Sequence, residues 1–387
     1  MFAIFSITMS NILNKNCGVE GLTFDDVLLL PGFANFWRES VDLTTFLHPT
    51  LKLRLPVISS PMDTVTMSDM AITMATNGGL GVIHRSMSVE AQALEISKVK
   101  AILGNNPNSA VDSHNRLLVA GAVGVGEDFE GRVAGLAQVG VDLFVVDTAH
   151  GHVQFIIDAI QYIKKSTNIP VMAGNITTCE AALALIDAGA DILRVGMGPG
   201  SICTTRIVTG VGVPQLTAIS EVARGIELSG RDVKLVADGG IKQIGDMAKA
   251  IAFGANAVML GGLLAGWQQS PGEIKEVNNQ KFKIYRGMGS ASAMSEGSAA
   301  RYGQAGIEKS KLVSEGVEGL VKFKGNVEDL LCQIVGGLKS SCYYIGGQDL
   351  QEFQSKVKYI KISPASFGES MPHSITITEG GSSFLGK

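Results

Sequence analysis

The chain has 387 residues, of which 45% are hydrophobic and only 18% charged, so it can bury a large core in one big domain or two medium ones. Its formal net charge is -4 and its Lys and Arg residues are scattered, which argues against a basic face, so we expect no nucleic-acid partner. Five cysteines without a CxxC pair argue against a disulfide framework and a zinc site, and they favour a reducing compartment, the cytoplasm.

The N-terminus, Met1–Met9, is apolar but short, and it lacks a cationic lead. We therefore interpret residues 1–20 as an N-terminal extension rather than a signal peptide. No later segment offers a run of about 18 uncharged apolar residues, so we expect no membrane span. Residues 21–387 are predicted to form one domain.

Eight short apolar runs that end in Gly, Ser, Asn or Asp alternate with stretches of helical periodicity. Continuous Val, Ile and Leu runs are typical of strands buried on both faces, as parallel sheets require. The predicted strands are Leu55–Ser60, Leu80–His84, Leu117–Val123, Val141–Asp147, Ile169–Asn175, Ile192–Gly196, Val233–Gly239 and Ala257–Gly262. The predicted helices are Ser68–Thr76, Glu90–Leu103, Phe129–Val139, Val153–Lys164, Thr178–Ala188, Gln215–Leu228 and Ile244–Phe253. This order favours an α/β fold closed as a (β/α)8 TIM barrel, with an open doubly wound sheet as the alternative.

Polar residues or glycine lie at or just past the C-terminal ends of the predicted strands. Active sites of barrels are built on this face. The residues are Ser60, His84, Asp147, Asn175, Arg194, Asp238 and Gly261. Any one of them could be a loop residue that caps a strand, but their joint placement predicts a site.

The stretch Gly196–Arg206 reads Gly-Met-Gly-Pro-Gly-Ser-Ile-Cys-Thr-Thr-Arg and contains a lone thiol, Cys203, after three glycines. Glycines permit positive φ and close backbone approach, so this loop can wrap an ion or a phosphate with main-chain groups. The alternative is a buried structural cysteine beside a tight turn. The flanking residues favour a nucleophile close to an anion.

Two glycine pairs end the last two strands, in Asp238-Gly-Gly-Ile241 and Leu260-Gly-Gly-Leu263. Barrels commonly hold a phosphate at this position, against loop amides and a short helix N-terminus. Ser201 lies nearby in the Cys203 loop, so we expect a phosphorylated substrate.

The chain after the eighth strand is rich in Gly, Ser, Ala and charge over residues 266–320. Long irregular loops in compact domains are usually lids or linkers. We expect a mobile flap over residues 290–320 that covers the site and carries Arg301 and Tyr302 to it, rather than a passive linker.

Seven motifs in order resemble the IMP dehydrogenase and GMP reductase family from about residue 20 to 380. They are Thr23-Phe-Asp-Asp26, Ser59-Ser-Pro-Met-Asp-Thr-Val-Thr66, Asp147-Thr-Ala-His-Gly-His152, the Cys203 loop, Val211-Gly-Val-Pro-Gln215, Asp238-Gly-Gly-Ile241 and Tyr285-Arg-Gly-Met-Gly-Ser290. Most dehydrogenases of the family carry a pair of cystathionine-β-synthase-type regulatory modules after the second helix. Here residues 98–116 cross directly to the third strand, so the chain resembles the short members that lack this pair.

The resemblance implies NAD-dependent oxidation of IMP to XMP, a step of guanine nucleotide synthesis. Cys203 would attack C2 of the inosine base, hydride would pass to NAD+, and water would then release XMP from the cysteine. Thr205 would lie beside the reacting carbon, with Glu315 reaching both it and the purine edge. Arg301, assisted by Tyr302, would be the unusual base that activates water.

The family's binding residues carry over one by one. Substrate contacts would be Ser60, Met62, Ser201, Asp238, Gly240, Gly261, Gly262, Tyr285, Gly287, Met288, Gly289 and Glu315. Cofactor contacts would be Asp147, Thr148, Asn175, Gly196 and Gly198. A K+ ion would bind Gly198, Gly200 and Cys203, together with Glu369 and Ser370 of the partner subunit in the C-terminal segment 360–387. This last assignment implies a homotetramer.

Three alternatives stay open. GMP reductase, which deaminates GMP to IMP with NADPH, lacks the flap pair in its familiar forms, yet Gly262 in Leu260-Gly-Gly-Leu263 and the stretch 340–346 are closer to it. We expect the dehydrogenase, because the flap pair bears on the step that separates the two reactions. An inactive nucleotide-binding barrel would be expected to lose Cys203 or the pair. His150 and His152 are expected to shape a loop rather than act as bases.

Overall fold

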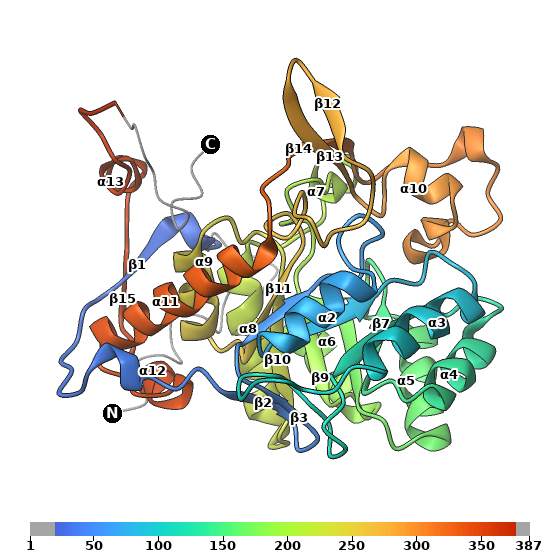
Figure 1. Cartoon of the computed structure of the whole chain (residues 1–387), viewed down its shortest axis with the longest axis horizontal. Helices are drawn as coiled ribbons and strands as arrows, with labels where there is room; N and C mark the ends of the chain where they lie inside the picture. Colours follow the sequence, from blue (N-terminus) through green and yellow to red (C-terminus); the bar gives the residue numbers. More distant parts are fainter. Residues whose placement is uncertain (1–19, 377–387) are drawn as a thin grey trace.

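A computed structural model of the chain describes residues 20–376. Its centre is a closed parallel barrel in the order β10-β11-β4-β5-β6-β7-β8-β9 (Figure 1). The strands are β4 (Val57–Ser59), β5 (Leu80–Ile83), β6 (Val119–Val123), β7 (Leu143–Asp147), β8 (Val171–Ile176), β9 (Ile192–Val195), β10 (Lys234–Asp238) and β11 (Ala257–Leu260). All eight predicted strands are present, so the closed barrel is confirmed and the open sheet is excluded.

All seven predicted helices are also present and cover the outside of the barrel. They are α2 (Ser68–Thr76), α3 (Val89–Lys100), α4 (Phe129–Gln138), α5 (Gln154–Ser166), α6 (Cys179–Asp187), α8 (Gln215–Ser229) and α9 (Ile244–Ala252). The eighth outer helix, α11 (Val327–Ile345), was not predicted. It packs on α9 and buries Leu331, Ile334 and Leu338, which follow helical spacing.

The apolar core has two parts, one inside the barrel and one between the strands and the helices. Side chains alternate along each strand, so Ile192 of β9 belongs to the inner core and Leu193 to the outer core. A hairpin of β2 (Thr45–His48) and β3 (Leu51–Leu53) adds leucines to the inner core. Apolar side chains therefore fill most of the barrel interior, and the predicted polar site residues lie at the C-terminal ends of its strands.

The segment after β11 is more regular than predicted. It forms an antiparallel sheet of β12 (Lys275–Val277), β13 (Gln280–Arg286) and β14 (Glu318–Lys322), which projects from the barrel in Figure 1. Between β13 and β14 lie α10 (Ala291–Ser295), η3 (Ser298–Tyr302) and η4 (Lys309–Lys311). The expected flap is therefore held at both ends by the pairing of β13 with β14, two strands that were not predicted because the composition of this segment resembles a loop.

The remaining elements join or flank the barrel. They are η1 (Phe24–Asp26), β1 (Val27–Leu29), η2 (Arg38–Ser40), α7 (Thr205–Thr209), α12 (Leu350–Lys356), β15 (Tyr359–Lys361) and α13 (Pro364–Glu369). Only residues 101–118 connect α3 to β6, so no regulatory domain is inserted there. In the part of the chain described, no helix is long and apolar enough to cross a membrane. Part of the predicted N-terminal extension, residues 1–19, lies outside the described residues, as do residues 377–387.

Candidate active site

A cavity of about 520 Å³ lies at the C-terminal ends of the barrel strands. Most of the predicted site residues line it. They are Ser60, Met62, Asn175, Gly196, Gly198, Gly200, Ser201, Cys203, Thr205, Asp238, Gly240, Gly261, Gly262, Tyr285, Gly287, Met288, Arg301, Tyr302 and Glu315. The structure thus brings together side chains from the barrel loops, β13 and the segment between β13 and β14.

A few predicted residues are not part of this lining. Asp147 is buried beneath Arg301, Thr148 follows it, and Gly289 packs against the ring of Tyr302. Glu369 and Ser370 lie at the end of α13, which packs on η1 and stands apart from α7 in Figure 1. Within one subunit they do not meet the Cys203 loop.

The Cys203 loop is shaped by glycines and by one arginine. Gly198 has φ +79°, and a Cβ atom there would collide with the Arg206 side chain. Arg206 donates to the carbonyl of Met197 at 3.1 Å and to that of Val213 at 2.6 Å. The guanidinium of Arg206 therefore connects the two sides of the loop. Glycine is needed at position 198 because the backbone there passes close to the Arg206 side chain.

Cys203 begins a chain of hydrogen bonds. Its Sγ lies 3.2 Å from Thr205 Oγ1, which in turn donates to Glu315 Oε2 at 2.8 Å. Backbone pairing brings these residues together, because Thr204 N donates to Glu315 O at 3.0 Å and Cys203 pairs with Gly316. A thiol, a hydroxyl and a carboxylate in this order can move a proton away from the sulfur.

Arg301 reaches the barrel from η3 and bonds the carboxylate of Asp147. Its Nη1 lies 2.7 Å and 2.6 Å from the two oxygens. Burial opposes the charge on Arg301, but Asp147 raises the pKa of the guanidinium above its ordinary value. Burial likewise opposes the charge on Asp147, yet Arg301, Arg194 and Arg85 together lower the pKa of this carboxyl. Both groups are therefore charged in this arrangement.

Asn175 and Gln215 hold the strand ends in register with the Cys203 loop. Asn175 Nδ2 donates to the carbonyl of Gly196 at 2.8 Å and to Asp238 Oδ2 at 2.9 Å. Gln215 Nε2 donates to the carbonyls of Val195 and Asp238, both at 2.9 Å. Among residues 20–376 the buried Oδ1 of Asn175 has no hydrogen-bond partner, and Asn175 lines the cavity, so this oxygen can accept a hydrogen bond from a bound ligand.

The two glycine pairs lie where a phosphate was predicted. A Cβ atom at Gly261 would come within 3.1 Å of the Tyr285 hydroxyl, and one at Gly262 within 3.0 Å of Ser201 Oγ. The glycines thus leave room beside two hydroxyl groups. Burial raises the pKa of Tyr285 to about 12, so its hydroxyl stays protonated and can donate to an anion.

Three residues near the site were not assigned a role from the sequence. Arg194 was recognised only as a polar strand end, although an arginine inside an apolar parallel strand is itself a signal. Gln215 was noted only as the end of the motif Val211-Gly-Val-Pro-Gln215, and Lys242 carried no signal. His84, another predicted strand end, is buried away from the cavity, and burial lowers its pKa to about 4.

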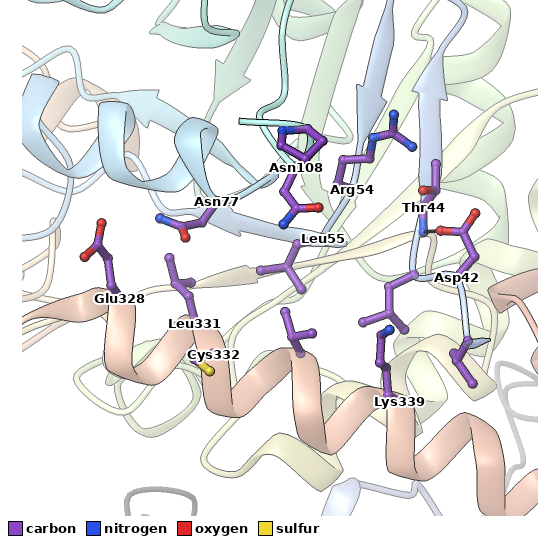
Figure 2. A pocket seen from close by; sticks show the side chains of 14 residues that line it. Asp42, Thr44, Arg54, Leu55, Asn77, Asn108, Glu328, Leu331, Cys332 and Lys339 are labelled. Atoms are coloured by element: carbon purple, nitrogen blue, oxygen red, sulfur yellow. Dashed lines mark hydrogen bonds between the residues drawn. The ribbon is translucent and has the colours of Figure 1, made fainter. Parts of the chain in front are cut away.

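A second cavity, of about 600 Å³, lies beside α11 (Figure 2). The labelled polar side chains around it include Asp42, Thr44, Arg54, Asn77 and Lys339. None of the predicted site residues that the structure describes lines it, and no C-terminal end of a barrel strand opens into it. We therefore place the chemistry in the first cavity.

A family model described as the IMP dehydrogenase / GMP reductase domain matches residues 21–373. Two similar proteins are an inosine-5'-monophosphate dehydrogenase from Rhizobium tropici and one from Staphylococcus aureus strain Mu50 / ATCC 700699. The first is 38% identical over 486 aligned positions, which cover 96% of this chain and 97% of that protein. The second is 38% identical over 475 positions, covering 93% and 97%. These alignments are longer than this chain, so both relatives contain segments with no counterpart here.

Proposed function

The chain belongs to the IMP dehydrogenase / GMP reductase family, and on this premise we propose that it oxidises IMP to XMP with NAD+ as the hydride acceptor. One observation carries the choice of reaction: Arg301 and Tyr302 line the same cavity as Cys203. A flap arginine beside the nucleophile suits a reaction whose second half is an attack by water. The names of the two relatives support the same direction.

Cys203 supplies the nucleophile for the first half of the reaction. Its proton can pass through Thr205 to Glu315, along the hydrogen bonds of 3.2 Å and 2.8 Å, as sulfur bonds to C2 of the base. NAD+, when bound, accepts the hydride that leaves C2. The nucleotide then stays attached to Cys203 until water attacks C2, releases XMP and restores the thiol.

Asp147 is proposed to hold the cofactor, through the hydroxyls of the nicotinamide ribose. In the structure both of its oxygens bond Arg301, so the flap and the cofactor compete for one carboxylate. The unpartnered Oδ1 of Asn175 supports a ligand on this side of the cavity. Departure of the reduced cofactor would free Asp147 for Arg301 and admit water.

Arg301 as the base for water requires one further condition. A guanidinium ordinarily stays protonated in proteins, and Asp147 strengthens that preference here. Arg301 can therefore accept a proton only when the bond to Asp147 is loosened. Thr205 and Glu315 form a second route for the same proton.

A K+ ion fits the carbonyls of the Cys203 loop. In the described part of the chain, no donor contacts the carbonyl oxygens of Gly198 and Cys203, while that of Gly200 accepts from Cys203 N at 3.1 Å. Carbonyl oxygens suit hard cations. We propose that Glu369 and Ser370 of the partner subunit complete the site, within a homotetramer in the cytoplasm.

GMP reductase is the second candidate, favoured by Gly262 beside Ser201. The two reactions separate in one assay. Purified protein given IMP and NAD+ should form NADH and XMP, and Cys203→Ala should form neither. Consumption of NADPH with GMP and release of ammonia, without NADH formation from IMP, would reverse the assignment.

A further inference from the structure

Arg194 is the largest side chain buried in the barrel, with 2% of its surface exposed, and it lies between two carboxylates. Its Nε donates to Asp238 Oδ2 at 2.9 Å, and its Nη1 bonds Asp147 Oδ1. Asp147 belongs to the proposed cofactor side of the cavity and Asp238 to the proposed substrate side. One guanidinium thus contacts both halves of the site.

The strand pattern explains this position. Ile192 and Val236 belong to the inner core, so Arg194 and Asp238, two residues further on, point into the barrel at its top. Asp147 follows Val145 in the same way. These three side chains form a polar layer above the apolar interior.

Gly174 of β8 makes room for that layer. It pairs with both Asp147 and Arg194, and a Cβ atom at this position would overlap the backbone and Cβ of Arg194. The glycine between the two strands therefore lets the arginine lie across β8. A planar guanidinium can then bond carboxylates on either side at once.

The surroundings of Asp147 show what Arg194 adds. The carboxylate is contacted by Arg301 from the flap and by Arg194 from β9, and Arg85 Nη2 lies 3.4 Å from the Asp147 backbone carbonyl. Arg301 belongs to the flap and Arg194 to a barrel strand, so a movement of the flap would take Arg301 away and leave Arg194 in place. Without Arg194, the carboxylates of Asp147 at the end of β7 and Asp238 at the end of β10 would lose their shared cation.

We propose that Arg194 is a positioning residue that holds the cofactor carboxylate Asp147 and the substrate carboxylate Asp238 in one rigid frame, whether the flap is open or closed. This inference rests on the proposed function for the identity of the two ligands. It predicts that a substitution of Arg194 weakens the binding of both ligands. A purely structural arginine would instead lower stability without moving the binding constants.

The test uses the full chain with Cys203→Ala, in which turnover is blocked and both ligands can be titrated at equilibrium by calorimetry. In this background Arg194→Gln should raise the Kd of IMP and the Kd of NAD+, each by about tenfold or more, because each ligand loses a charge-supported carboxylate. The Kd of NAD+ should also rise as the pH falls toward 5.5, since loss of Arg194 makes Asp147 easier to protonate even with Arg85 and Arg301 nearby.

Arg132→Gln is the matched control. Arg132 is also a buried arginine, with 5% of its surface exposed; it bonds Gln92 and Asp128 and lies outside the cavity. The Arg132→Gln substitution should reduce thermal stability and leave both Kd values and their pH dependence unchanged. If Arg194→Gln behaves like this control, or changes the Kd of one ligand only, the proposal is wrong.

Arg194→Lys is a second variant, which keeps the proposal testable if Arg194→Gln does not fold. It keeps a buried cation, but a single ammonium cannot copy the two-sided fork, so at least one Kd should rise. A folded Arg194→Lys with both Kd values of the unsubstituted background would also overturn the proposal. The titrations do not depend on turnover. If the protein does not oxidise IMP, the same test can be made by titrating GMP and NADPH.

Discussion

At the scale of single residues, Arg301 illustrates how one side chain can meet two demands. It bonds Asp147 through Nη1, while its buried Nε has no partner in the described structure. The pair with Asp147 favours the charged guanidinium, whereas activation of water needs a proton acceptor. The two demands are compatible only if Arg301 acts in the second half of the reaction and its bond to Asp147 is loosened as water attacks.

Arg301→Gln should therefore separate the two halves. Hydride transfer should survive as a burst of about one NADH per active site, with kcat lowered roughly 100-fold or more because release of XMP becomes slow. Stopped-flow absorbance measures the burst, and intact mass shows the nucleotide attached to Cys203. Lys309→Gln, an exposed change in the same flap, should keep wild-type kcat. Unchanged kcat in Arg301→Gln would refute the role of the flap.

His84 gives a prediction about acid stability. It is 4% exposed, and burial lowers its pKa to about 4, whereas an unfolded histidine titrates near 6.5. Between these values the unfolded chain binds more protons, so acid should reduce the free energy of unfolding. Replacing this histidine should remove that part of the loss.

His84→Gln should lose about 2 kcal/mol less of its unfolding free energy than the wild type between pH 7 and pH 4.5. Urea unfolding at the two pH values measures this. His114→Gln, at an exposed position, should show the wild-type loss. Equal pH dependence in His84→Gln and the wild type would show that His84 is not the group that titrates.

At the scale of elements, the buried cation of Lys100 stabilises the short connection between α3 and β6. Lys100, the last residue of α3, contacts Asp112 at 2.9 Å, Asp142 at 2.8 Å and the carbonyl of Leu117 at 3.1 Å. Asp142 also accepts from Val119 N at 2.8 Å. The residues that lead from α3 directly to the third barrel strand are therefore held by charge as well as by packing.

Lys100→Met should lower the free energy of unfolding by about 3–5 kcal/mol, because it leaves two nearly buried carboxylates without their cation. Chemical denaturation measures the loss, and the KM for IMP should not change, since Lys100 is remote from the cavity. Lys311→Met removes an exposed pair with Glu308 and should cost much less, because water screens the two charges. Similar losses in both variants would contradict the argument from burial.

At the scale of the whole molecule, the barrel interior divides into an apolar lower part and a polar top. The leucines of the β2–β3 hairpin, among them Leu47, Leu51 and Leu53, complete the lower part. The top layer of Asp147, Arg194 and Asp238 rests on it. The residues that stabilise the barrel therefore lie in its lower part, and the residues proposed to bind the ligands lie at its top.

Leu51→Ala should lower the free energy of unfolding by about 2–5 kcal/mol through the cavity that it leaves, with little effect on kcat at 25 °C. Thermal unfolding and steady-state kinetics on the same sample test both statements. Leu94→Ala, at a position that is 59% exposed, is the control and should change stability much less. A large fall in kcat in folded Leu51→Ala would mean that the packing of the lower core affects the polar layer at the top.

The barrel could be predicted from the amino-acid sequence, because strands buried on both faces leave continuous apolar runs and their crossover helices leave a different period. The sequence also located much of the site, since the C-terminal ends of parallel strands meet on one face. The sheet of β12, β13 and β14 and the eighth outer helix were not predicted, because the sheet lies in, and the helix follows, a long segment whose composition resembles a loop.

Which charged groups meet could not be read from the sequence and follows from the folded chain. Arg301 bonds Asp147 across more than 150 residues, Thr205 bonds Glu315 across 110, and Arg194 reaches both Asp147 and Asp238. Local patterns specify the direction in which a side chain leaves its strand or helix. Whether two such directions converge depends on how the barrel closes and how the flap packs, so the contacts that distinguish the chemistry belong to the fold rather than to any segment.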